Sequence, residues 1–350
     1  MRKTFLVAIT SVLLGLGFAT FANAELVAYW PFDDFDNEES TPDVVNGYDL
    51  QVEFLDNTSF FDDGNHVDGR IGKAFEFFNE DTTILSRIHD PEDLLPINKH
   101  PEFTISFWSN VEGTGQNDLR LISEGSIENG TPLFNIGTAN NGNDGTLDIF
   151  IRNEGNTGHL RTNAEPFDAE WHHIGWTFRD GVHSIYIDGV LDRTVDWPSF
   201  GETDPFPLDN TSVGGIQRAN PSHWVTGIID DVAMWNEVLP PVSISSLAAE
   251  TVTPLDALDV LIGDFNFDGV IDDDDYGIIV TNFRDPGTYN EGDINGDGVV
   301  DLFDFGEFLD RAEAVGASVP QTIPEPTGLA LVVMGLLFSG LLRKRGQARG

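Results

Sequence analysis

A twelve-residue, aspartate-rich pattern occurs twice in the last third of this 350-residue chain and limits how that region can fold. The first copy, at 264–275, reads DFNFDGVIDDDD, and the second, at 293–304, reads DINGDGVVDLFD. The copies register at an offset of 29 residues, with Asp or Asn at positions 1, 3, 5, 9 and 12 and glycine at position 6. Hard cations take six or more oxygen ligands, and the glycine permits the sharp turn that wraps the chain around an ion.

The two copies therefore predict two calcium sites. The ligands predicted for the first are Asp264, Asn266, Asp268, the backbone carbonyl of Val270, Asp272 and Asp275, and those for the second are Asp293, Asn295, Asp297, the carbonyl of Val299, Asp301 and Asp304. Position 9 would ligate directly or through a water, and position 12 is Asp where an EF-hand usually has Glu. An aspartate-rich turn without metal is the alternative, but two copies in register favour the metal sites.

Apolar residues follow each loop at the spacing of a helix face. After the first loop they are Tyr276, Ile279, Val280 and Phe283, and after the second, in the same phase, they are Phe305, Phe308, Leu309 and Ala312. Positions i, i+3, i+4 and i+7 lie on one side of an α-helix. The region is therefore predicted to be a loop followed by a helix, twice, with two apolar faces that pack together.

Residues 255–315, with these matched loops and helices, resemble the dockerin domain, a duplicated calcium loop and helix. The resemblance implies a small α-helical calcium-binding domain and, as its partner, a cohesin domain. Dockerins that bind cohesins commonly carry small hydroxyl residues at loop positions 10 and 11. Here Asp273 and Asp274 hold those positions in the first loop, and Leu302 and Phe303 hold them in the second. The sequence thus matches the family at the calcium ligands and departs from it at the recognition positions.

Both ends of the chain carry targeting segments. Residues 1–24 combine two basic residues, an apolar stretch over 5–18 and the small-residue pattern Ala22-Asn23-Ala24. These features predict a signal peptide that is cleaved on export, with an uncleaved anchor as the alternative. After a linker at 316–323, the triplet Pro324-Glu325-Pro326 precedes an apolar run at 328–342 and then three basic residues. The apolar run is predicted as a transmembrane helix with its basic end in the cytoplasm.

Residues 324–350, with the P-E-P triplet, the apolar helix and the R-K-R finish in order, resemble the PEP-CTERM sorting signal. The resemblance implies recognition by an exosortase, a membrane protease-transpeptidase, in a Gram-negative-type bacterium. The protein is then expected to be exported, anchored in the membrane by its C-terminal helix before processing, and delivered to the cell surface or extracellular matrix. A plain membrane anchor is the alternative.

The composition excludes several function classes. The chain has 18 basic and 59 acidic residues, a formal net charge of −41, which argues against nucleic acid as a partner because a phosphate backbone requires Lys and Arg. It has no cysteine, so disulfides, thiolate metal sites and cysteine nucleophiles are excluded.

Residues 25–250 read as a mainly β domain. Apolar residues come in short runs separated by Gly, Asn and Asp, and the predicted strands are 26–30, 74–78, 103–111, 119–123, 147–152, 171–179, 182–187, 191–195 and 227–235. Asp180-Gly181 and Asp188-Gly189 supply tight turns between three successive strands. Short strands at this spacing predict an antiparallel sandwich, and residues 242–249 are predicted as a short closing helix.

This domain resembles the concanavalin A-like, laminin G-type jelly roll. The residues that carry the resemblance are Leu26–Phe32, Ala74–Phe77, Phe103–Trp108, Trp171–Ile174, Tyr186–Gly189 and Gly227–Val232. They are mainly core and turn residues, so they imply the fold more than a particular activity.

No catalytic motif is present in the sequence of the β domain. His172 and His173 are adjacent on a predicted strand and would point to opposite faces, which favours packing over chelation of one metal. There is no G-x-S-x-G elbow, H-E-x-x-H or P-loop, and no E-x-D-x-E run that would place two carboxylates on one face for glycoside hydrolysis. Trp197 and Trp224, in Pro/Ser-rich loops, are candidates either for stacking on a sugar or for covering the core edge.

Three functions remain open. The favoured one is a non-catalytic exported surface protein whose jelly roll binds glycan or protein ligands and whose calcium module is structural. The second is a glycoside hydrolase or lyase on the jelly roll. The third is a cohesin-binding component of a surface assembly.

Overall fold

The computed structural model describes residues 25–36, 39–55, 65–131, 133–141, 144–153, 156–196 and 208–322. The predicted signal peptide, the sorting signal with its apolar helix, and Trp197 lie outside the described residues. Within the described residues, no helix has the length and apolar character needed to cross a membrane.

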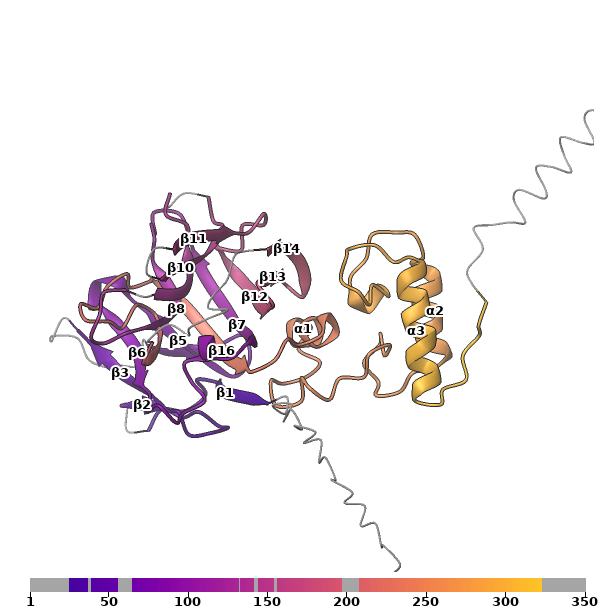
Figure 1. The fold of residues 1–350 in the computed structure, drawn as a ribbon, viewed down its shortest axis with the longest axis horizontal. Coiled ribbons are helices and arrows are strands. Elements are labelled where there is room, and N and C mark those ends of the chain that lie inside the picture. The colour runs from indigo at the N-terminus through magenta and orange to yellow at the C-terminus, as the bar shows by residue number, and fades with distance from the viewer. Residues whose placement is uncertain are drawn as a thin grey trace, which may run out of the picture.

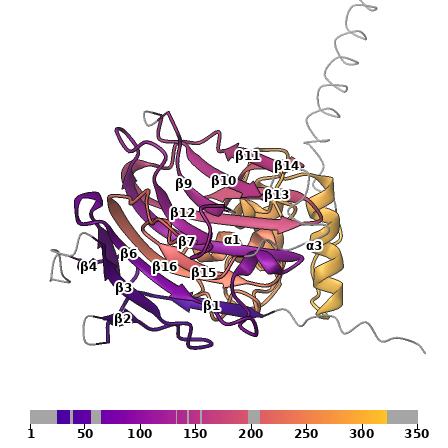
Figure 2. The ribbon, with the colours of Figure 1, turned by 60° about the vertical axis from the view of Figure 1, so that its left-hand side comes forward.

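Two antiparallel sheets form the larger part of the molecule (Figures 1 and 2). The first sheet contains β14 (Val190–Asp196), β13 (Val182–Ile187), β12 (Asp168–Arg179), β7 (Glu102–Glu112), β16 (Gly227–Trp235), β5 (Lys73–Phe77) and β4 (His66–Asp68) in that order, with β1 (Leu26–Trp30) also paired to β16. The second contains β11 (Asn156–Arg161), β10 (Leu147–Asn153), β9 (Leu133–Thr138), β8 (Arg120–Gly125), β15 (Asn210–Val213), β6 (Thr83–Ile88), β3 (Leu50–Phe54) and β2 (Ser40–Thr41). The predicted antiparallel sandwich is confirmed.

The predicted meander of three strands is confirmed at its turns. Strands β12, β13 and β14 are neighbours in the first sheet. Both turn dipeptides have positive φ at both residues: 53° and 83° at Asp180 and Gly181, and 51° and 80° at Asp188 and Gly189. This is the conformation of a type I′ hairpin turn, which matches the twist of the flanking strands.

The core lies between the two sheets and is rich in aromatic residues. Trp176 on β12 is fully buried, stacks on Phe134 of β9 with ring centroids 4.7 Å apart, and meets Phe103 edge-on at 5.2 Å. Trp30, Trp108 and Trp235 are also buried. Trp171 is only half-buried, because β12 extends there beyond the covered part of the sheet.

Helix α1 (Pro241–Ala248) lies on the outer face of the first sheet. Ile244 of α1 packs over Gly175 of β12, where a Cβ would lie 2.9 Å from the isoleucine side chain. Ile244 and Leu247 form a second apolar cluster with Tyr29, Tyr186 and Trp235. This face of the sandwich is therefore covered by the protein itself.

The C-terminal module contains α2 (Asp273–Thr281) and α3 (Leu302–Ala314), which lie side by side in Figure 1. As predicted, each helix follows an aspartate-rich loop, and the apolar faces meet in one cluster that includes Ile279, Phe305 and Phe308. The cluster also contains Val242 of α1, and Pro241 lies against Gly296 of the second loop. The module thus packs on the sandwich through α1. Three 3-10 turns complete the elements, η1 (Asn79–Asp81), η2 (Ile97–Lys99) and η3 (Tyr289–Glu291).

Candidate functional site

The first aspartate of each loop is held by backbone N–H groups of its own loop. The carboxylate of Asp264 accepts from the N–H groups of Asp268 at 3.1 Å and Gly269 at 2.7 Å. Asp293 accepts from Asp297 at 3.2 Å and Gly298 at 2.8 Å, the equivalent residues of the second loop. Gly269 and Gly298 have φ of 87° and 88°, a left-handed conformation that glycine adopts at little cost. The two loops therefore share one backbone path.

The last aspartate of each loop closes the loop and also caps the helix that follows. Asp275 accepts from the N–H groups of Phe265, Asn266 and Asp272. Asp272 is the N-cap of α2, so positions 9 and 12 form a capping box, and Asp301 and Asp304 repeat it at α3. Each carboxylate oxygen has more than one lone pair, so these hydrogen bonds leave acceptor capacity for a cation.

Four carboxylates in the loops are buried without a positive partner. Asp264, Asp275, Asp293 and Asp304 are between 0% and 4% exposed, and no salt bridge to them occurs within the described residues. Burial raises the pKa of Asp275, Asp293 and Asp304 above the ordinary range. Buried carboxylates are costly unless a cation compensates them. The donor set of each loop, which combines carboxylates, an asparagine amide oxygen and backbone carbonyls, is the set that Ca²⁺ prefers.

The loops are more open than a closed metal site. Among the described residues, no three or more His, Asp or Glu side chains are gathered tightly enough to hold an ion by themselves. Asn266 donates to Asp268 at 3.0 Å, so positions 3 and 5 of the first loop contact each other instead of pointing at a common centre. Asn295 and Asp297 hold the equivalent positions in the second loop, where the Asp297 N–H donates to the Asn295 side chain at 2.8 Å. Val270 and Val299 expose their side chains, leaving the backbone carbonyl as the group that would ligate.

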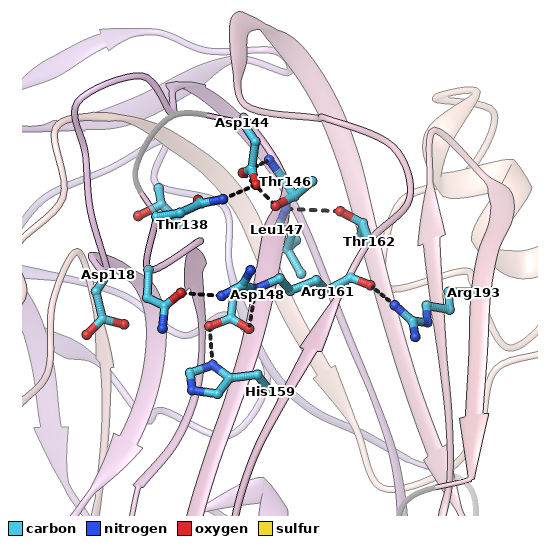
Figure 3. A network of polar contacts seen from close by, with 12 residues as sticks. Asp118, Thr138, Asp144, Thr146, Leu147, Asp148, His159, Arg161, Thr162 and Arg193 are labelled. Carbon is cyan, nitrogen blue, oxygen red and sulfur yellow. Dashed lines mark hydrogen bonds and ion pairs between the residues drawn. The ribbon is translucent and has the colours of Figure 1, made fainter.

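A second candidate site is the outer face of the second sheet, opposite to the face whose β10 residues Leu147, Ile149 and Ile151 belong to the core. Figure 3 shows the polar network that includes Asp148 and His159. Asp148 on β10 is fully buried and pairs with His159 of β11 at 2.8 Å, and Arg161 lies 3.9 Å away. Burial raises the pKa of Asp148 despite these partners. Next to them Arg120 of β8, 2% exposed, is paired with Asp118 and donates to the Thr138 carbonyl at 3.2 Å. This network was not predicted from the sequence, because only the pairing of β10 with β9 and β11 brings its members together.

Aromatic side chains lie on the same face. Phe150 on β10 is half-buried, with the His159 ring 4.6 Å from its centroid and the Arg120 guanidinium 5.5 Å above it. Trp224 is half-buried beside Gly215, and its backbone forms an isolated β-bridge with that of Arg120. Its indole N–H is buried and lacks a partner among the described residues. Trp224 therefore covers the sheet more than it extends into solvent.

The two adjacent histidines point to opposite faces, as predicted. His172 bonds to Asp188 at 2.7 Å and Asp168 at 3.2 Å. His173 is 1% exposed, bonds to Ser106 at 2.8 Å, and burial lowers its pKa to about 4. A cavity of about 10 Å³ next to His173 and Asp231 lies beneath α1 and has room for about one water. This buried cluster is inaccessible to a sugar.

The carboxylates with the largest pKa shifts are also buried. Burial, followed by the charge of Asp231, raises the pKa of Asp230 to about 8. Burial raises the pKa of Asp231 to about 7, although Tyr29 donates a hydrogen bond to it. Glu124 is fully buried between β8 and η2, and burial raises its pKa to about 7. These carboxylates have a structural role, because none of them faces a space large enough for a substrate.

A further cavity, of about 280 Å³, lies where β6 leads toward β7. It is lined by residues that include His89, Pro91, Pro96, Lys99 and Asp209. Burial lowers the pKa of His89 to about 4, and Lys99 donates to the Leu95 carbonyl at 3.1 Å. Lys99 and Asp209 are engaged in the protein's own contacts, so this cavity is a weaker candidate than the outer face of the second sheet.

Comparison with known proteins places the fold. Residues 87–245 match the family model of the concanavalin A-like lectin/glucanases superfamily. No curated protein matches the sequence. Among solved structures, domain 4 of AbnA, an extracellular GH43 arabinanase from Geobacillus stearothermophilus solved with arabinotriose, is 19% identical with a TM-score of 0.48, covering 64% of this chain and 98% of that one.

Two larger proteins match over the same share of this chain. The receptor binding domain of botulinum neurotoxin C/D mosaic serotype is 15% identical with a TM-score of 0.47. The sialidase of Trypanosoma rangeli is 15% identical with a TM-score of 0.46. Each match covers 64% of this chain, but only 51% of the toxin domain and 32% of the sialidase. The description of the family model that matches residues 87–245 names both lectins and glucanases.

Proposed function

We propose that this protein, whose sandwich has the concanavalin A-like lectin/glucanase fold, is an exported, non-catalytic binding protein that recognises glycan through the outer face of its second sheet. The observation that carries the proposal is the pairing on that face of a half-buried aromatic ring, Phe150, with the charged network of Asp148, Arg120 and His159. Ligand sites commonly combine apolar surface with a few fixed polar groups.

The opposite face of the sandwich is a poorer candidate. Helix α1 covers part of the outer face of the first sheet, and the cavity beneath this helix has room for about one water.

The test of glycan binding is a glycan array probed with the purified protein in calcium. Binding that is lost on Phe150→Ala and kept on Phe283→Ala, a change in the C-terminal module, supports the proposal, and an array without any bound glycan contradicts it.

The two aspartate-rich loops are proposed to hold one calcium ion each, with a structural role. Bound calcium would supply the positive charge that the buried carboxylates lack, and the loops would close around it. Asp275 and Asp304 would then link the ion to α2 and α3, because each already caps its helix. The second loop also contacts α1 through Gly296 and Pro241, so calcium there would stabilise the packing of the module on the sandwich.

The protein is further proposed to act at the cell surface or in the extracellular matrix after export and recognition of its tail by an exosortase. A cohesin domain is the further alternative partner, at the C-terminal module. Phe303 is 79% exposed and Leu302 is 55% exposed at the positions where a dockerin would contact it. A calcium-dependent pull-down with cohesin domains would establish that partner.

The alternative is an enzyme acting on polysaccharide, and one observation favours it. Asp148 lies on the proposed binding face, pairs with His159 and has a pKa raised by burial, a direction of shift that general acids in glycoside hydrolysis share, although its side chain is fully buried here. Release of reducing ends from polysaccharides that is abolished by Asp148→Asn would establish hydrolysis and overturn the non-catalytic proposal.

A further inference from the structure

Two arginines on the outer face of the second sheet have no carboxylate partner within the described residues. The side chain of Arg152, on β10, is exposed and makes no hydrogen bond or ion pair within the described residues. Arg218 is half-buried and donates only to neutral oxygens, namely the carbonyls of Asn220 and Gly130, both at 3.2 Å, and the Ser222 hydroxyl at 2.7 Å. These contacts hold the Arg218 side chain in place without neutralising it.

The two guanidinium groups face the same region. The hydrogen bond from Arg218 to the Gly130 carbonyl places the Arg218 guanidinium next to the segment that leads into β9. Leu133, the first residue of β9, is the cross-strand partner of Arg152. The pKa of Arg218 is lowered, by burial first and then by the positive charges of Arg152 and Arg120. Positive charge is therefore concentrated on this face.

Two carboxylates on this face are already engaged. Asp118 pairs with Arg120 and lies 3.5 Å from His223, and Asp148 pairs with His159. The chain has 59 acidic residues and 18 basic ones, so acidic partners are abundant in the sequence. An unneutralised pair of arginines in such a chain points to an anion supplied from outside.

We propose that Arg152 and Arg218 bind the carboxylate of an acidic sugar residue on the glycan. This rests on the proposed glycan-binding function and names the class of its ligand. A guanidinium presents two parallel N–H donors that match a carboxylate. Phe150 lies two residues before Arg152 on β10, hence on the same face, and offers apolar surface beside the two charges.

The charge of the whole chain restricts the ligand further. A net charge of −41 repels polyanions, whereas the arginine pair acts locally because salt screens charges over about 8 Å at physiological ionic strength. The ligand should therefore carry isolated acid groups on an otherwise neutral glycan. A densely charged polymer would meet repulsion outside the site.

The test uses matched oligosaccharides that differ in one group. Titration calorimetry of the full chain compares uronate-bearing oligosaccharides with their methyl esters, which keep the backbone and lose the charge. Sulfated oligosaccharides and oligoglutamate serve as other anions. The variants are Arg152→Gln and Arg218→Gln, and the matched control is Arg179→Gln, which removes an arginine paired with Glu102 on the other sheet.

The proposal predicts that one uronate oligosaccharide binds at least about tenfold more tightly than its ester, and that each site variant loses about tenfold, because a charge-assisted hydrogen bond is lost. Arg179→Gln should bind like the wild type. Arg152 is exposed, so its replacement should leave the fold intact.

Equal binding of acid and ester, or unchanged binding in Arg152→Gln, would overturn the proposal and leave glycan binding standing. Tighter binding of sulfated sugar or of oligoglutamate would also overturn it. If no oligosaccharide of either kind binds, the glycan-binding function itself fails.

Discussion

Asp275 and Asp304, 29 residues apart, make equivalent backbone hydrogen bonds, each closing one loop and capping one helix. Asp275 accepts from Phe265 at 2.7 Å and Asp272 at 2.9 Å, and Asp304 accepts from Ile294 at 3.0 Å and Asp301 at 2.7 Å. Both are fully buried. The duplication seen in the sequence is thus also a duplication of side-chain contacts, and it concentrates negative charge at two helix N-termini, where the helix dipole tolerates it.

Calcium binding should couple to folding of the C-terminal module. Replacing Asp264 and Asp293 with Ala should leave residues 255–315 sensitive to protease and low in helix in calcium, because the loops cannot then gather their ligands. Circular dichroism and limited proteolysis, with and without chelator, measure this.

Asp310→Ala, an exposed change on α3, is the control and should behave like the wild type. If a chelator changes neither the helix signal nor the protease resistance of the wild-type protein, the loops bind no structural calcium.

The buried carboxylate of Asp230 should make stability fall as pH rises. Its pKa is raised to about 8 in the folded protein, from an ordinary value near 3.8, so the folded state holds the proton more tightly than the unfolded state. The resulting stabilisation is complete below the ordinary pKa and is lost as pH rises toward 8.

Asp230→Asn should therefore become progressively more stable relative to the wild type between pH 4 and pH 8. Melting temperatures across this range report it, and the side-chain oxygen of Asn still accepts from Arg70 and Ile71. Parallel melting curves for variant and wild type at every pH would show that Asp230 is ionised in the folded protein.

Gly214 should be intolerant of a side chain. It has φ of 88°, and a Cβ there would lie 2.2 Å from the ring of Phe77. Gly214→Ala is expected to lose about 1–3 kcal/mol from overpacking, in addition to backbone strain. It should also weaken glycan binding, because Gly214 begins the segment that carries Arg218.

Gly130→Ala is the matched control, since nothing lies within 4 Å of its Cβ position. Chemical denaturation of both variants measures the difference. Equal stabilities would mean that the segment from Gly214 shifts freely, and that its arginine is not held in place.

Local sequence patterns predicted those strands whose own residues alternate in polarity or are bounded by clear turn residues. Alternating Ile174, Trp176 and Phe178 with two Asp-Gly turns sufficed for β12 to β14, and β1, β13 and β16 have the predicted bounds. Strands β2, β3, β4, β6, β9, β11 and β15 were not predicted. In β15, Asn210, Thr211 and Ser212 are all fully buried, so polar residues occupy positions where the pattern expects apolar ones.

The candidate site depends on register, which the sequence alone does not reveal. The aspartate loops were visible because all their ligands lie within twelve residues. Arg120, Arg152 and Arg218 lie on β8, on β10 and in the segment after β15, and only the order of strands in the second sheet brings them to one face.

Non-catalytic glycan binding is tested by incubating the protein with the glycan it retains best on the array, and measuring bound ligand and reducing ends in the same sample. We expect saturable binding with the glycan recovered intact. Release of reducing ends at a rate proportional to enzyme concentration, and absent in Asp148→Asn, would contradict it.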